Sequence, residues 1–299
     1  MARSGLLTRA PDAPAGGGRV ARRDRRRARW PALALVYAVL TVSCLAAVIP
    51  FMYVVAAAFK DSAALFSYPP ELVTWPPYLG NFTALVTEHP FGRWLLNTIV
   101  VTLTITVAKL LIDSLAGYAF AKLDFPGREP LFVALIATLM VPFAAIMMPL
   151  LQMMQGAGLV DTYWALILPP LANPIGIFLM RQFIEGLPGD LDNAARMDGC
   201  SELAIFRHVV LPLTKPALTV LAVLHLLNQW NSFLWPLVVT RSQDMQVLTV
   251  GIASLKGLLR ADWGLIAAGA LLSMVPLVVL FVLFQRYFVA ASLFGAVKE

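Results

Sequence analysis

The chain has 299 residues, of which 59% are hydrophobic and only 13% are charged, and its mean hydropathy is +0.76. Soluble domains carry roughly a quarter charged residues, so much of this surface must face something other than water. The net charge of +6 does not indicate nucleic-acid binding, because nine of the 23 Lys and Arg residues precede residue 30 and no basic, aromatic surface follows them.

Residues 1–30 are rich in Arg, Ala, Gly and Pro, a composition that buries little apolar surface, so we predict a disordered basic tail. A basic run before an apolar stretch also occurs in cleaved signal peptides. Residues 31–59, however, contain no charge and exceed the length of a signal-peptide core. We therefore expect a complete first transmembrane helix, which forms a segment 31–92 together with an extracellular loop.

Further apolar segments follow, each too long for a strand and lacking the polar face of a soluble helix. Because backbone groups cannot stay unpaired in lipid, these segments must be helical. The predicted fold class is therefore an all-α integral membrane protein with about six transmembrane helices. Prolines at 142, 149, 169, 170, 174 and 276 predict kinks or early helix ends. The five segments after the first helix are residues 94–121, 131–160, 162–180, 216–240 and 263–285.

The distribution of Lys and Arg predicts the orientation of the chain. If the N-terminus is inside, the inner segments hold 17 of the 23 basic residues and the outer segments hold five. The positive-inside rule then places both termini in the cytoplasm. We find no internal sequence repeat, so an inverted-repeat secondary transporter gains no support.

The largest inner loop, residues 186–213, is predicted to form two short helices, and we call it the knob. Pro188-Gly189 breaks the preceding helix, Gly199 ends the first short helix, and Ser201 caps the next. Leu203, Phe206 and Val210 are expected on one face, with Pro212 stopping the helix. Such a knob suits docking into a groove on a partner, although a surface-lying loop without a partner fits the pattern equally.

The knob resembles the coupling loop of binding-protein-dependent ABC importer permeases. The resemblance is carried by Asn193-Ala194-Ala195, Asp198-Gly199 and Leu211-Pro212 at the family's spacing. The family's coupling Glu is Asn193 here. An Asn keeps a hydrogen bond but loses its charge-assisted part, worth about 1 kcal/mol. Asp192, one residue earlier, points about 100° away on a helix and is an imperfect substitute. Further matching motifs are Asn81-Phe82, Pro90-Phe91, Leu96-Asn97, Ala119–Lys122, Phe125–Arg128, Trp230–Pro236, Leu248–Gly251, Asp262–Gly264 and Phe284–Phe288.

These motifs are similar to those of the maltose-type, six-span carbohydrate permeases. The resemblance implies a type I importer bundle, with a transmembrane domain over residues 93–290 and a cytoplasmic tail over 291–299. It implies uptake of a sugar, a di- or oligosaccharide, across a bacterial inner membrane. The expected partners are a second permease, an ATPase dimer that binds ATP and Mg²⁺, an extracellular sugar-binding protein and the lipid bilayer. The chain itself has no P-loop motif, so we expect no cofactor in it.

Polar residues inside the apolar segments are the candidate pathway-lining residues. Lys109 and Asp113 lie four apart on one helical face and are expected to pair with each other or to face water, as a structural ion pair or as a pathway element. A polar cluster in the segment 216–240 offers amide groups and a flat aromatic ring, which would suit a sugar or would form hydrogen bonds between neighbouring helices. Its candidate residues are Asn228, Trp230, Asn231 and Ser232. His225 is isolated on an apolar face, and we expect it to be a packed residue.

The sequence gives little support to two other function classes. An ion-coupled secondary transporter needs membrane acids, and only Asp113 is available. An intramembrane hydrolase is not indicated, because the three histidines form no His-Glu-x-x-His motif and no Gly-x-Ser-x-Gly occurs. We therefore predict no catalytic residues and no metal site. Cys44 and Cys200 lie in an apolar run and a charged loop, so no disulfide is expected.

Overall fold

The computed structural model describes residues 29–66, 74–257 and 261–296, so the predicted disordered tail, apart from its last two residues, lies outside the described residues. Within the described ranges the chain is helical, and the only β-type pairing there is an isolated bridge between Lys256 and Ala261. The predicted all-α class is confirmed. Residues 1–53 and 54–299 form two compact units, which are described separately.

Helix α2 (Arg29–Ala58) makes up the described part of the first unit and continues into the second. Its side chains are apolar around the whole circumference, and those of residues 33–53 are exposed. A helix of this kind is unsuited to water, and its apolar stretch is long enough to cross a membrane. It is the helix that the sequence predicted over residues 31–59.

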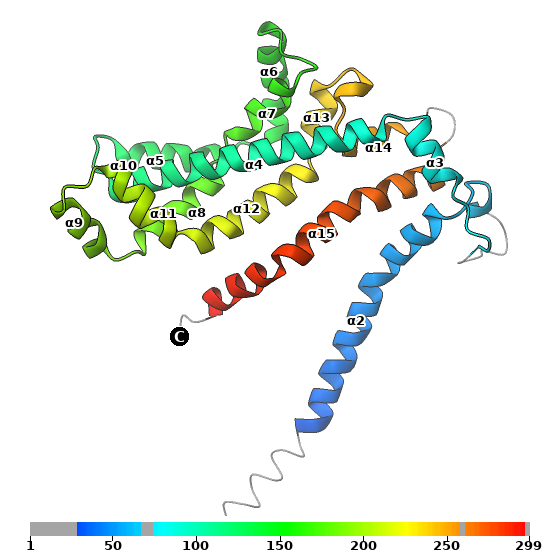
Figure 1. Ribbon diagram of the computed structural model, residues 1–299, viewed down its shortest axis with the longest axis horizontal. Coiled ribbons are helices and arrows are strands. Elements are labelled where there is room, and N and C mark those ends of the chain that lie inside the picture. Colours follow the sequence, from blue (N-terminus) through cyan, green and yellow to red (C-terminus); the bar gives the residue numbers. More distant parts are fainter. Residues whose placement is uncertain (1–28, 67–73, 258–260, 297–299) are drawn as a thin grey trace, which may run out of the picture. The chain divides into compact units, whose positions relative to one another are not determined.

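The second unit is built on four helices: α4 (Phe91–Lys122), α8 (Pro174–Glu185), α12 (Lys215–Trp230) and α15 (Trp263–Ala296). Helix α4 packs along α8 and α12, and α12 packs on α15 (Figure 1). Helix α15 continues to Ala296, so helical structure extends into the predicted tail 291–299, of which residues 297–299 lie outside the described part.

Glycines allow α4 and α8 to approach closely. A Cβ on Gly117 of α4 would lie 2.6 Å from the Cβ of Met180 and 3.0 Å from the backbone N of Arg181 on α8. A Cβ on Gly176 of α8 would collide with the carboxylate of Asp113 on α4. Small residues at helix crossings are the usual means of close packing in membranes, where lipid tails supply no hydrophobic drive for association.

Several predicted spans are broken. The segment 131–160 divides at Val141-Pro142 into α5 (Arg128–Ala137) with η2 (Thr138–Met140), and α6 (Phe143–Gly156), which bend by 100°. Helix α7 (Tyr163–Leu171) meets α8 at 44° just before Pro174. Among the described helices, three can cross a membrane alone, or up to six spans form if each bent pair counts as one.

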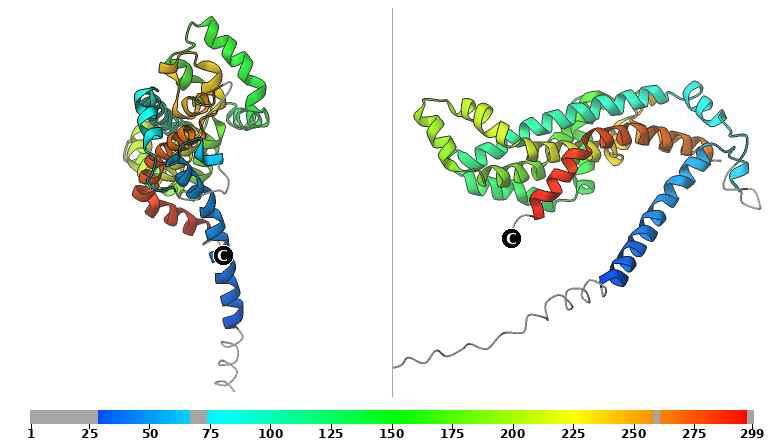
Figure 2. Two further views of the ribbon diagram at one scale, coloured as in Figure 1. Left: turned by 90° about the vertical axis from the view of Figure 1, so that its right-hand side faces the viewer. Right: turned by 60° about the horizontal axis from the view of Figure 1, so that its bottom comes forward.

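Short elements close the two ends of α4. At its Phe91 end lie η1 (Ala64–Phe66), α3 (Gly80–Thr87), η4 (Gln243–Met245) and α14 (Leu248–Ser254). Helix α13 (Leu234–Val239) packs on α7. At its Lys122 end lie α9 (Gly189–Met197), α10 (Glu202–Ile205), the π-helical turn η3 (Phe206–Val210) and α11 (Leu211–Leu213), as Figure 2 shows. The knob is therefore a separate layer at one end of the bundle.

Candidate functional site

The knob folds much as its sequence predicts. Helix α9 begins at Gly189, after Pro188, and ends before Gly199, whose φ of +79° is the left-handed conformation that favours glycine. The Ser201 side chain caps α10 by accepting a hydrogen bond from the N–H of Ala204 at 3.4 Å. Two short helices therefore lie side by side, joined by a tight turn.

Asp192 faces the interior of the chain. Only 4% of it is exposed, and its Oδ2 lies 2.7 Å from Nζ of Lys122, the last residue of α4. The same ammonium donates to the carbonyl of Leu187 at 3.1 Å. Asp192 thus attaches α9 to α4 from the inner face of the knob.

The remaining predicted coupling residues lie on two sides of the knob. Asn193 and Ala194 are exposed, whereas Ala195 packs against the buried cluster that contains Tyr118 and Met180. Asp198 and Gly199 are exposed at the turn between α9 and α10. Leu211 is half-buried and Pro212 is exposed, and Pro212 sits in the first turn of α11 where it was expected to end a helix. Proline is tolerated there because the first N–H groups of a helix need no intrahelical acceptor.

The prediction that Leu203, Phe206 and Val210 share one face is wrong for Leu203. Phe206 and Val210 are buried, but Leu203 is 69% exposed. Leu203 lies in α10, before the π-helical turn, and the buried Ile205 joins Phe206 and Val210 in the inward-facing cluster in its place. The exposed large apolar residues of the knob are Leu191, Met197, Leu203 and Leu213.

A polar chain holds the two knob helices together. Arg196 Nε donates to Glu202 Oε1 at 2.8 Å, and the Tyr118 hydroxyl of α4 donates to Glu202 Oε2 at 2.6 Å. The hydrogen bond from Arg196, followed by that from Tyr118, lowers the pKa of Glu202, and the same bond with Glu202 raises the pKa of Arg196. Both groups are charged at neutral pH and tie the knob to α4 a second time.

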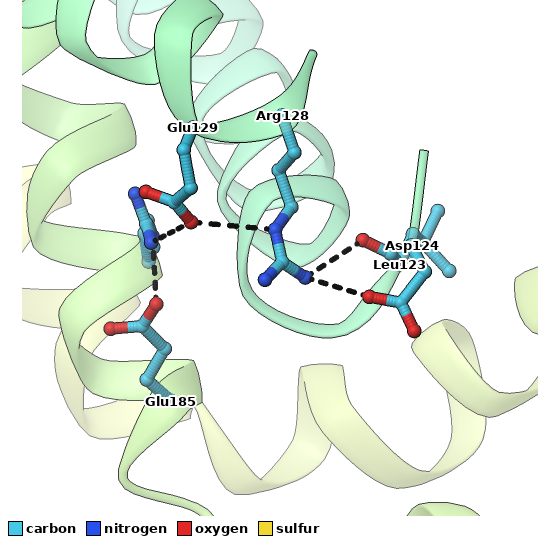
Figure 3. Close-up of polar contacts among 6 residues, drawn as sticks. Leu123, Asp124, Arg128, Glu129 and Glu185 are labelled. Atoms are coloured by element: carbon cyan, nitrogen blue, oxygen red, sulfur yellow. Dashed lines mark hydrogen bonds and ion pairs between the residues drawn. The ribbon is translucent and has the colours of Figure 1, made fainter. Parts of the chain in front are cut away.

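A second polar network, not predicted from the sequence, lies where α5 and α8 meet. Arg181 donates to Glu129 at 2.9 Å and to Glu185 at 2.7 Å, and its guanidinium lies 3.9 Å from the centre of the Phe132 ring. Arg128 bonds the Leu123 carbonyl and Asp124 and pairs with Glu129 (Figure 3). This network fixes α5 against the end of α8, next to the knob.

A cavity of about 590 Å³ lies between α4, α6, α7 and the break after α12. It opens where helices end or bend, so backbone carbonyls as well as side chains can face it. Its apolar wall includes Phe143, Ile146 and Trp235. Its polar lining consists of Lys109, Asn173, Asn228, Gln229, Asn231 and Ser232.

The structure thus brings together four of the predicted pathway residues, namely Lys109, Asn228, Asn231 and Ser232. Trp230 is placed elsewhere, packed against Trp94 and Leu248. Asn173 was not predicted, although the sequence Pro169-Pro170 followed by Asn173-Pro174 marked a helix break where an Asn commonly caps the next helix, and it does accept from Ile175 N–H at 3.0 Å.

Of the two arrangements expected for Lys109 and Asp113, an ion pair with each other is not formed, whereas Lys109 lines the cavity. Asp113 Oδ2 lies 2.7 Å from Nε2 of His225 on α12, and both side chains are buried. His225 is therefore not a simply packed residue but the partner of Asp113. Space over Gly176 lets the carboxylate turn toward α8 and α12. The pair crosslinks the bundle and does not line the cavity.

At the Phe91 end of α4, side chains hold the backbone of segment 241–247. Asn97 donates to the carbonyls of Asp244 and Gln246 at 2.7 and 2.8 Å and accepts from Tyr163 at 2.6 Å. Trp94 donates to the carbonyl of Gln243 at 2.9 Å. These contacts, which the sequence did not predict, fix the segment without using its own side chains.

Asp161 holds the start of the same segment. It accepts the N–H groups of Arg241 and Ser242 at 2.8 and 3.1 Å. Burial raises its pKa, but the two backbone N–H groups outweigh burial, so the net pKa is lowered.

In the described part of the chain, no three His, Cys, Asp or Glu side chains gather as a metal site would require.

Comparison with known proteins gives consistent matches. The family model described as binding-protein-dependent transport system inner membrane component matches residues 113–292. The arabinooligosaccharides transport system permease protein AraQ of Halalkalibacterium halodurans is 42% identical over 255 residues, covering 84% of this chain and 91% of that protein. The lactose transport system permease protein LacG of Rhizobium radiobacter is 33% identical, covering 88% and 95%.

The fold is shared with a solved transporter. A chain of a bacterial ABC transporter involved in the import of the acidic polysaccharide alginate aligns with a TM-score of 0.75 at 23% identity, covering 88% of this chain and 98% of that chain. A chain of the alginate transporter in complex with its pentasaccharide-bound periplasmic protein aligns with a TM-score of 0.61 at 15% identity. The chain described here belongs to the binding-protein-dependent transport system inner membrane components, and it is a multi-pass protein of the inner membrane.

Proposed function

We propose that this chain is one of two permease subunits of an ATP-driven importer and that it lines a passage for a di- or oligosaccharide. The observation that carries the proposal is the cavity at the helix breaks, whose amides, hydroxyl and aromatic wall offer what a sugar requires. Buried polar groups within membrane helices commonly line cavities or contact partner helices. Relatives named for arabinooligosaccharide and lactose transport support the same cargo class.

In this proposal the knob docks on a separate ATPase subunit, which binds ATP and Mg²⁺. Asn193, Ala194, Met197 and Leu203 present its exposed surface. Closure of an ATPase dimer would move α9, and the contacts of Asp192 and Glu202 would pass that movement to α4. The chain performs no chemistry itself; binding energy from the partners shifts the helices between inward-open and outward-open arrangements.

The other parts of the assembly follow from the same proposal. The Lys122 end of α4 and both termini face the cytoplasm, and segment 241–247 faces an extracellular sugar-binding protein. A second permease subunit completes the passage. The coupling Glu of the family is absent, so the knob contacts the ATPase through the Asn193 amide and the exposed apolar residues.

The cavity is tested by uptake into proteoliposomes that contain the complete complex. Asn228→Leu together with Asn231→Leu should reduce ATP-dependent oligosaccharide uptake by about fivefold to a hundredfold, because two hydroxyl partners are lost at a net cost of about 0.5–1.5 kcal/mol each. Thr104→Leu, an exposed position on α4 outside the cavity, is the matched control. Uptake that continues without ATP and follows an ion gradient would instead indicate a secondary transporter.

The docking surface is tested by crosslinking in a chain whose two cysteines are replaced by alanine. A cysteine at Met197, which is 89% exposed, should crosslink to the ATPase subunit. A cysteine at Asp61, exposed at the Phe91 end of α4, should not. Crosslinking at Asp61 and not at Met197 would reverse the proposed orientation.

A further inference from the structure

We propose that the cavity contains an anion subsite at Lys109, so that the carbohydrate passing through it carries an acidic group such as the carboxylate of a uronic acid. This inference rests on the proposed function and specifies its substrate class. Three features carry it: the burial of Lys109, the partner of the nearest carboxylate, and the composition of the cavity lining.

Lys109 is a buried cation that faces the cavity. Only 6% of it is exposed, and it is one of the residues that line the cavity. Among the described residues, none forms a hydrogen bond or an ion pair with it. Burial removes most of the water that hydrates an ammonium group in solution. Without a counter-ion to compensate for this loss, a buried ammonium is strongly disfavoured. The site is therefore suited to a ligand that brings a negative charge.

The nearest carboxylate on the same helix is already committed. Asp113 lies one turn from Lys109, but its Oδ2 is 2.7 Å from His225 Nε2 and its carboxylate rests against Gly176. It is not among the cavity-lining residues. Asp113 exerts some attraction on the ammonium at a distance, but it leaves the hydrogen-bonding positions of Lys109 free for another group.

The rest of the lining is polar and uncharged. Of the described residues around the cavity, none is acidic, so nothing in the lining would repel an anion. Asn173, Asn228, Gln229, Asn231 and Ser232 supply donors and acceptors for hydroxyl groups, and Trp235 and Phe143 supply flat apolar faces. The arrangement fits a sugar ring with one acidic substituent better than a small inorganic anion, which would use few of these groups.

Two other roles for Lys109 make different predictions. A lysine that only donates to sugar hydroxyls can be replaced in part by glutamine, which also donates but carries no charge. A lysine that pairs with an acidic residue of the second permease would affect every cargo equally when it is lost. A lysine that binds the acid of the cargo affects acidic cargo selectively.

The test uses the complete complex, with its binding protein, in proteoliposomes supplied with ATP. The probes are a mixed hydrolysate of arabinan, whose oligosaccharides are neutral, and a hydrolysate of glucuronoxylan, which contains xylotriose and its glucuronate-bearing counterpart. A phosphorylated disaccharide is added as a third probe, because an ammonium also binds phosphate. Mass spectrometry of the vesicle contents identifies what has accumulated in wild type, Lys109→Gln, Lys109→Arg and the control Lys215→Gln, an exposed lysine outside the cavity.

We expect the wild type to accumulate glucuronate-bearing oligosaccharides, and Lys109→Gln to lower the ratio of acidic to neutral uptake by about tenfold to a hundredfold, the usual effect of losing a charge-assisted hydrogen bond. Lys109→Arg and Lys215→Gln should keep the ratio. If the phosphorylated disaccharide accumulates in preference to the uronates, the group bound at Lys109 is a phosphate and not a carboxylate, and the uronate assignment is overturned.

A wild type that accumulates neutral oligosaccharides alone, or a ratio unchanged in Lys109→Gln, overturns the inference and leaves the proposed function standing. A wild type that accumulates no carbohydrate in the presence of ATP overturns the proposed function itself. A second measurement needs no variant: acetylation of Lys109 in the wild-type complex should be slowed by glucuronate-bearing xylotriose and not by xylotriose. Equal protection by both sugars contradicts the inference.

Discussion

The ammonium of Lys122 lies 2.7 Å from the carboxylate of Asp192, and only 12% and 5% of the two side chains are exposed. One residue ends α4, and the other belongs to the first turn of α9 in the knob. Because an ion pair this poorly hydrated depends on both partners, the knob and α4 are held in a fixed relation at this point.

Loss of one partner of this pair should uncouple hydrolysis from transport. Lys122→Met leaves Asp192 buried and unpaired, at a cost of about 3 kcal/mol for a pair with little solvent access. We expect lower thermal stability of the knob and a several-fold drop in sugar taken up per ATP hydrolysed, measured together in proteoliposomes.

The reversed pair, Lys122→Asp with Asp192→Lys, should recover part of that ratio, and Lys215→Met should leave it unchanged. If Lys122→Met transports with the wild-type ratio, the ion pair has no role in transmitting movement from the ATPase.

The helices were predictable because hydropathy is a local property of the sequence. Apolar runs of about 20 residues, interrupted by charge only at Lys109 and Asp113 in α4, identified the positions of α2, α4, α7, α8, α12 and α15. Breaks within runs were less predictable. Pro142 and Pro174 coincide with bends, whereas Pro149, Pro169 and Pro276 lie inside helices, because a membrane helix can satisfy the freed carbonyls through its neighbours.

The parts of the site that are formed by residues close in sequence were predicted. The contacts between residues far apart in sequence were not. Asn228, Asn231 and Ser232 follow one another at the end of α12, so they share the cavity. The spacing of four between Lys109 and Asp113 predicted that they pair with each other or face water. His225 is 112 residues from Asp113, and no local pattern indicates that α12 and α4 bring them together.

The close approach of α4 and α8 predicts opposite effects for two glycines of one helix. Gly117→Ala would place a Cβ 2.6 Å from that of Met180, so we expect the complex to lose about 1–3 kcal/mol of stability. Gly92→Ala meets nothing within 4 Å and should gain about 0.5 kcal/mol from the higher helix propensity of alanine.

Thermal unfolding of the purified complex in detergent measures both changes. Stabilisation by Gly117→Ala would show that α8 moves away from α4 in the assembled transporter.

The lowered pKa of Asp161 predicts a pH dependence of segment 241–247. A carboxylate whose folded pKa is below its usual value of about 4 stabilises the fold at all pH values above that usual value, and the stabilisation is lost as pH falls through the folded pKa. Protection of the Arg241 and Ser242 amides from hydrogen exchange, corrected for the intrinsic rate, should stay constant from pH 7 to about 5 and fall below about 4.

Asp161→Asn is the matched variant, because Asn also tolerates the left-handed φ of 63° at this position and keeps an accepting oxygen. Its amide protection should be lower at pH 7, by about 1 kcal/mol, and should not change between pH 5 and 3. A wild type whose protection falls already between pH 7 and 5 would mean that another group controls the segment.

Helix α4 is fixed at both of its ends. Its 32 residues span about 48 Å at 1.5 Å per residue. Lys122 and Tyr118 bind the knob at one end, and Trp94 and Asn97 hold the backbone of segment 241–247 at the other. A rigid helix anchored in this way would connect the surface that we propose for ATPase docking with the surface that we propose for the binding protein.

Asn97→Ala should therefore impair communication between the two sides of the membrane. Its amide makes three hydrogen bonds at 2.6–2.8 Å. Truncation removes the side-chain donor of the Gln246 carbonyl and leaves the Asp244 carbonyl with only the longer hydrogen bond from Arg93 Nε at 3.3 Å, at a cost of about 1–3 kcal/mol. We expect the stimulation of ATP hydrolysis by sugar-loaded binding protein to fall several-fold, while hydrolysis in the absence of binding protein persists, because the ATPase contacts at the Lys122 end are intact. Thr104→Ala, exposed on the same helix between the two anchored ends, should leave the stimulation unchanged. If Asn97→Ala responds to binding protein as the wild type does, segment 241–247 is not the part of this chain through which the binding protein acts, and the signal must reach the ATPase by another helix.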